Sequence, residues 1–117
     1  MKQKTFERAE AERLAPLIRS VGTEIRDRTQ AIARLTERLE ALQPDAGRHG
    51  PEIGSLRSDL SRHLRRLTKV RKEVEQLGLW MDEAQPLRIV VPCADGDWIY
   101  DGRLDGTNFY QLESAPV

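Results

Sequence analysis

The fold is decided by LAPLIRSVGTEIRDRTQAIARLTERLEAL at residues 14–42 and by IGSLRSDLSRHLRRLTKVRKEVEQL at residues 53–77. In both stretches apolar residues recur at alternating spacings of three and four, which is the a/d heptad pattern of packed helices. Arg28 and His63 are the polar members of these two stripes, and His63 suits a polar layer that sets the helix register. The stripes consist of Leu14, Ile18, Val21, Ile25, Arg28, Ile32, Leu35, Leu39 and Leu42, and of Ile53, Leu56, Leu60, His63, Leu67, Val70, Val74 and Leu77.

The segment QPDAGRHGP at residues 43–51 separates the two stripes and contains two prolines and two glycines. Such a segment ends one helix and begins the next. Because the connection is short, the two helices should be antiparallel neighbours. The sequence therefore predicts helices over about 7–43 and 51–77, within a helical hairpin at residues 1–78, and Gly78 suits the end of the second helix.

Residues 79–117 have a different pattern, with short runs of β-branched and aromatic residues at 87–91, 98–100 and 109–112. Asp95-Gly96 and Asp105-Gly106 lie between these runs and predict tight two-residue hairpin turns. We therefore expect a three-stranded antiparallel β-meander. Because three short strands need an apolar surface, the meander should pack on the open end of the hairpin. The predicted fold class is α+β.

Composition excludes several classes of protein. The 19 basic and 19 acidic residues cancel, so net charge gives no reason to expect nucleic acid as a partner. No apolar run reaches the roughly 18 residues that a membrane helix needs, and the charged N-terminus lacks a signal-peptide core. The single cysteine, Cys93, cannot form an internal disulfide. We therefore expect a cytoplasmic location and no membrane contact.

The sequence offers little catalytic chemistry. His49, His63 and Cys93 are far apart in the predicted fold, so no metal site is expected. Cys93 has no histidine or helix N-terminus near it to activate the thiol. The glycines occur singly and form no phosphate-binding loop. We therefore expect no enzyme activity and no cofactor.

Three hypotheses for function remain. The first, which the sequence favours, is a non-catalytic protein-interaction or dimerisation module, in which two hairpins form a homodimeric four-helix bundle. The residues that flank the seam and can widen it are Leu17, Ala31 and Leu64.

The second hypothesis, which we consider less favoured, is a nucleic-acid accessory factor. Residues 57–72 contain seven basic residues and one acidic residue, whereas the segment from Asp82 onward contains seven acidic and two basic residues. A basic helix flank can follow phosphates. The candidate residues on it are Arg62, Arg65, Arg66 and Lys69.

The third hypothesis is a small-ligand pocket between the helices and the meander. Aromatic residues make up only 5% of the chain, and several of them fall near this junction. Such side chains are more often part of a hydrophobic core, which is the competing interpretation. The candidate pocket residues are Trp80, Trp98, Tyr100 and Tyr110.

The chain also resembles a family of short uncharacterised bacterial proteins, catalogued as domain of unknown function 2203. It departs from that family's pattern in two places. Residues 87–92 stand where the family has a Gly-Leu-Val-Asp-Phe-Pro-like segment, and residues 110–113 stand where it has a Trp-His-Glu-like segment. The resemblance implies the layout of the fold and no activity. It rests on Lys4-Thr5-Phe6, Ala9-Glu10-Ala11, Leu14-Ala15-Pro16-Leu17-Ile18, Leu77-Gly78-Leu79 and the segment 98–113.

Overall fold

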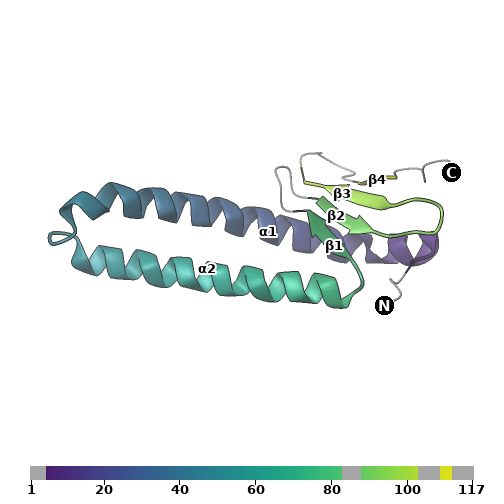
Figure 1. The fold of residues 1–117 in the computed structure, drawn as a ribbon, viewed down its shortest axis with the longest axis horizontal. Coiled ribbons are helices and arrows are strands. Elements are labelled where there is room, and N and C mark those ends of the chain that lie inside the picture. Colours follow the sequence, from purple (N-terminus) through teal and green to yellow (C-terminus); the bar gives the residue numbers. More distant parts are fainter. Residues whose placement is uncertain (1–4, 83–87, 103–108, 112–117) are drawn as a thin grey trace.

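Two long helices form an antiparallel hairpin in the computed structural model, which describes residues 5–82, 88–102 and 109–111 (Figure 1). Helix α1 spans Arg8–Leu42 and helix α2 spans Gly50–Gln76. The connection contains a short 3₁₀ helix, η1, at Gln43–Asp45. The predicted helices and their antiparallel arrangement are confirmed, with each boundary within one residue of the expected one.

Helix α2 ends where the sequence predicts, at a glycine in the left-handed region. Gly78 has φ 88° and donates its N–H to the carbonyl of Glu75. The N–H of Leu79 reaches the carbonyl of Val74, at 3.3 Å. This is the Schellman arrangement, which satisfies the last carbonyls of the helix and turns the chain back toward α1.

The chain then forms a four-stranded antiparallel sheet in the order β1-β2-β3-β4. The prediction of three strands was therefore one strand short. The missed strand is β1, which pairs Trp80 with Val90 and Asp82 with Arg88. Three residues are too few to show the alternation that identifies a strand from sequence, and β1 exists because β2 pairs with it. The strands are β1 at Trp80–Asp82, β2 at Arg88–Val91, β3 at Trp98–Asp101 and β4 at Phe109–Gln111.

The connection between β2 and β3 is longer than a two-residue hairpin turn, so that prediction was wrong. It runs over residues 92–97, and Gly96 donates its N–H to the carbonyl of Cys93 at 3.2 Å. Phe6 pairs with Cys93 in a parallel bridge, and its N–H donates to the carbonyl of Pro92 at 2.7 Å. The N-terminal arm is therefore hydrogen-bonded to this loop. The other predicted turn, at Asp105-Gly106, lies outside the described residues.

One face of the sheet packs against the base of the hairpin and forms the main core. The sheet lies over α1, and its first strand reaches α2 (Figure 1). Trp98 and Phe109 stack on this face with their ring centroids 4.2 Å apart. Each buried aliphatic side chain contributes roughly 1.5–3 kcal/mol, so this contact supplies much of the stability. The most deeply buried members of the core are Ala11, Ile18, Val70, Val74, Ile89 and Val91.

Sheet and helix approach each other closely at Gly22 of α1. A Cβ atom added at Gly22 would overlap the ring of Tyr100 and lie only 2.6 Å from its Cζ. Tyr100 is 4% exposed and belongs to the main core. The absence of a side chain at Gly22 therefore allows β3 to lie directly on the helix.

We expect Gly22→Ala to destabilise the protein by about 1–3 kcal/mol, because the added methyl group forces the tyrosine ring or the sheet to shift. The matched control is Gly54→Ala, where an added Cβ has no atom within 4 Å. That change should stabilise the protein by about 0.5–1 kcal/mol, the helix-propensity gain alone. Chemical denaturation of both variants measures the difference, and equal effects would contradict the close approach.

Candidate interaction surfaces on the hairpin

Burial differs sharply between the two ends of the hairpin. Under the sheet, Ile18, Ile25, Val70 and Val74 are 1–3% exposed. Further along, the seam is covered by no third layer among the described residues, and several of its members are only half-buried. These are Ile32, Leu35, Leu56 and Leu60, beyond which Leu39, Leu42 and Ile53 form a small second core at the tip.

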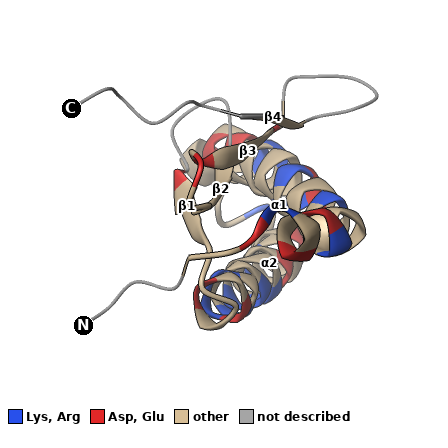
Figure 2. Ribbon diagram, turned by 90° about the vertical axis from the view of Figure 1, so that its right-hand side faces the viewer, with Lys and Arg blue, Asp and Glu red and all other residues tan. Residues whose placement is uncertain are grey.

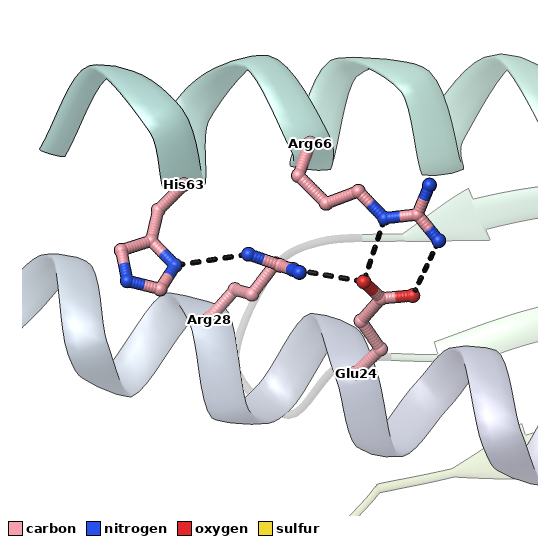
Figure 3. Close-up of polar contacts among 4 residues, drawn as sticks. All are labelled: Glu24, Arg28, His63 and Arg66. Atoms are coloured by element: carbon pink, nitrogen blue, oxygen red, sulfur yellow. Dashed lines mark hydrogen bonds and ion pairs between the residues drawn. The ribbon is translucent and has the colours of Figure 1, made fainter. Parts of the chain in front are cut away.

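A charged network crosses the seam between the two cores (Figure 3). Glu24 of α1 accepts two hydrogen bonds from Arg66 of α2, at 2.8 and 3.1 Å, and one from Arg28 at 2.8 Å. Arg28 in turn lies 3.1 Å from Nδ1 of His63. Because a guanidinium only donates, Nδ1 of His63 is the acceptor in this contact. The two polar seam positions therefore meet in one hydrogen-bonded cluster.

The two arginines hold Glu24 in its charged form. The hydrogen bond from Arg66 is the largest cause, opposed by burial and supported by Arg28, and together they lower the pKa of Glu24 to about 2. The same contact raises the pKa of Arg66. Each helix contributes two of the four side chains in this network. The network therefore links the helices by charge at the two polar positions of the otherwise apolar seam.

A groove runs between the helices beyond this network. It has a volume of about 390 Å³, and Ala31, Leu35 and Leu56 contribute its apolar lining. Ala31 follows Gly22 by nine residues, which is about two and a half helical turns. The groove therefore opens on the side of α1 opposite the sheet. Its polar lining residues are Arg34, Arg38, Asp59 and His63.

Charge is unevenly divided between the two rims of this groove. The rim formed by α1 carries Arg34 and Arg38, and the rim formed by α2 carries Asp59. Glu52 adds a second carboxylate to the α2 rim, where it accepts hydrogen bonds from Arg38 at 2.9 and 3.1 Å. The groove thus has one basic and one acidic edge.

The three apolar residues proposed to widen the seam do not share one face. Leu17 is 45% exposed and lines a small cavity with Val74 and Ile89 at the junction with the sheet, whereas Ala31 lines the groove. Leu64 is 47% exposed and is not among the residues that line this groove. Leu64 follows Asp59 by five residues, which turns it well away from the groove.

The four basic residues proposed to bind nucleic acid do not all have the same surroundings. Arg66 points into the hairpin toward Glu24 (Figure 3). Arg62 binds Asp59 at 2.7 Å, while Arg65 and Lys69 are exposed to solvent. The structure therefore removes Arg66 from the exposed basic flank. Glu24, its partner, was not identified from the sequence, although its spacing of four from Arg28 was a usable signal.

The four aromatic residues proposed for a ligand pocket lie on two faces of the sheet. Trp98 and Tyr100 are buried in the main core. Trp80 pairs with Val90 and Tyr110 pairs with Ile99 on the other face, where Trp80 is 49% exposed. The four rings therefore do not converge. One cavity at the junction, beside Leu17, Val74 and Ile89, has a volume of only about 10 Å³, about the space of one water.

The residues that the structure describes contain no group of three or more side chains able to hold a metal ion. Burial, with a smaller contribution from Asp95, raises the pKa of the Cys93 thiol. A protonated, buried thiol is a poor nucleophile.

The fold and surfaces define a class: a helical hairpin capped at its base by a small antiparallel sheet, with an open groove on its free side. The model of the family described as "Uncharacterized conserved protein (DUF2203)" matches residues 4–97. The chain therefore belongs to this family. The match ends before the segment 98–113, on which the sequence resemblance also drew.

Comparison with curated proteins and with solved structures finds no significant match. Among the described residues, no helix is both long enough and apolar enough to span a bilayer.

The charged network gives a prediction for stability against pH. Glu24→Gln should cost about 1–3 kcal/mol at neutral pH, since hydrogen bonds to charged groups are lost. The pKa of Glu24 is lowered from 4.5 to about 2, so its contribution is complete above pH 4.5 and lost as the pH falls toward 2. The difference between wild type and variant should shrink over that interval in urea titrations.

The matched control is Glu52→Gln, which removes the exposed interhelical pair with Arg38. We expect this change to cost about 0–1 kcal/mol. If both variants lose the same stability, Glu24 has no special role in joining the helices.

Proposed function

We propose that the protein is a non-catalytic interaction module that forms a homodimer through the sheet-free side of its hairpin. In this arrangement two hairpins pack groove to groove and make a four-helix bundle. The observation that carries the proposal is the half-buried distal seam. At the base the sheet covers the seam from one side, and a second hairpin would cover the seam beyond it from the opposite side.

The residues of the groove suit such packing. Ala31 is small and half-buried, so it lets another helix approach closely, and Leu35 and Leu56 offer aliphatic surface beside it. Covering these side chains would add favourable apolar burial of about 25 cal/mol for each Å² removed from water.

Charge selects one orientation for the second copy. If the two-fold axis runs along the hairpin, the basic α1 rim of each copy faces the acidic α2 rim of its partner at the same level. Arg34 and Arg38 would then lie opposite Asp59 and Glu52 of the second copy, with the two tips at the same end. The reverse orientation would set α1 against α1, and like charges would meet.

The available area is large enough for a stable dimer. Helix α2 has 27 residues and is therefore about 40 Å long. Two helices side by side are about 20 Å wide, so the free side offers about 800 Å² per copy. A standard specific interface buries about 800 Å² per partner.

The resemblance to bacterial proteins and the single unpaired cysteine support a bacterial cytoplasmic setting for this module.

Light scattering should give twice the 13.4 kDa chain mass at tens of micromolar protein. Ala31→Glu should weaken the dimer at least about tenfold, because it places a charge in an apolar contact. The matched control Ala33→Glu changes an exposed position and should leave the dimer intact. Circular dichroism checks that both variants keep their helices. A monomer for the wild-type chain would exclude the proposal.

A spin label at Ala46→Cys, in the loop at the tip, tests the orientation. Aligned tips should give a short distance between the two labels of a dimer. Opposed tips would place the two labels at opposite ends of the overlap between the hairpins, and that longer distance would overturn the proposed charge pairing. Because Cys93 is buried, labelling should occur at the tip.

A further inference from the structure

The outer face of α2, opposite the seam, has an unusual composition. At 3.6 residues per turn, a sector of about 120° on this side contains only basic, hydroxyl, amide, proline and glycine residues. No carboxylate and no large apolar side chain falls in it. The side chains of this basic face are Ser58, Ser61, Arg62, Arg65, Thr68, Lys69, Lys72 and Gln76, all exposed.

The cations of the basic face have few partners. Arg62 binds Asp59 at 2.7 Å. Across the described residues, no carboxylate lies within 4.0 Å of the charged groups of Arg65, Lys69 or Lys72. Asp101 ends β3, and β3 and β4 lie on the far side of α1 from α2 (Figure 2), whereas β1, which carries Asp82, contacts α2. The chain's net charge of zero therefore hides a local positive stripe.

We infer that this basic face binds the phosphate backbone of double-stranded nucleic acid. Lysine and arginine neutralise phosphates, and serine hydroxyls donate hydrogen bonds to phosphate oxygens. Arg62 and Lys72 are ten residues apart, so the stripe is about 15 Å long. A duplex carries one charge per about 1.7 Å, which gives several phosphates within reach of that length.

The composition of the face separates this partner from two others. A protein interface usually has buried aromatic or aliphatic anchors, and the basic face has none. Single-stranded nucleic acid is held by stacking on aromatic side chains, which are also absent from α2. A duplex needs neither, because its backbone is read by charge and hydrogen bonding. The contact should therefore be independent of base sequence.

The inference goes beyond the proposed dimer and does not depend on it. Asp59 and His63 of α2 line the groove, whereas Arg65 and Lys69 point away from it. The basic face is therefore open in one hairpin and in a pair of hairpins alike. Loss of dimerisation through Ala31→Glu should leave duplex binding at the basic face, so the two proposals can fail separately.

Fluorescence anisotropy with a labelled 20-base-pair duplex of random sequence tests the inference, using the full chain. With three to four phosphates neutralised, log affinity should fall against log salt with a slope of about −3 to −4. That slope means about a 100-fold weaker Kd at 200 mM than at 50 mM salt.

The test variant is Arg65→Gln/Lys69→Gln/Lys72→Gln, for which binding should drop at least tenfold and the slope should fall to about −1. The control is Arg13→Gln/Arg26→Gln/Arg48→Gln, which removes the same charge from exposed positions elsewhere. Thermal melting checks that both remain folded. The control should bind like the wild type, and an equal loss in both variants would overturn the inference.

Two competitors complete the experiment. Unlabelled duplex should displace the label, while polyglutamate at the same charge concentration should not. Displacement by polyglutamate, tighter binding of a single strand than of the duplex, or no binding at 50 mM salt would each overturn the inference.

Discussion

The hairpin depends on an apolar seam that two helices alone cover incompletely. Two helices bury the side chains between them but leave grooves open along both sides of the contact. At the base of this protein the sheet covers one of these sides, and Ile18 and Val70 become almost inaccessible to solvent. Beyond the sheet, Leu35 and Leu56 keep part of their surface exposed. The seam is thus buried at the base of the hairpin and partly exposed to solvent beyond the sheet.

The network around Glu24 lies between the part of the seam that the sheet covers and the part that is open to solvent. It replaces an apolar layer by a carboxylate shared between two arginines, and the arginine at the seam also reaches His63. Breaking such a partly buried set leaves charges without partners, which disfavours any shifted register of the helices. The network also pairs Arg66 with Glu24, so Arg66 does not add its charge to the basic face of α2.

The sheet determines how the remaining surfaces can be used. By packing through Tyr100 onto Gly22 it occupies one side of α1 and leaves the opposite side, at Ala31, open. The outer face of α2 is exposed for a different reason, because it points away from both the seam and the sheet. A groove with apolar lining and a purely polar stripe thus lie on separate parts of one helical hairpin. Their different compositions suit different kinds of contact.

The sequence by itself determined the two helices, their antiparallel order, the stop at Gly78 and the location of β2, β3 and β4. These features follow from heptad spacing, turn residues and β-branched runs, which act over a few neighbouring residues. Only the tertiary structure decided which side chains meet across the chain. Strand β1 forms because β2 pairs with it, and the aromatic rings divide between two faces because of sheet register. Arg65 and Arg66 are adjacent, and the step of about 100° between neighbouring helical residues turns Arg66 toward the seam, but only the tertiary structure shows that Glu24 lies within its reach. Such contacts join residues distant in sequence, so no local pattern encodes them.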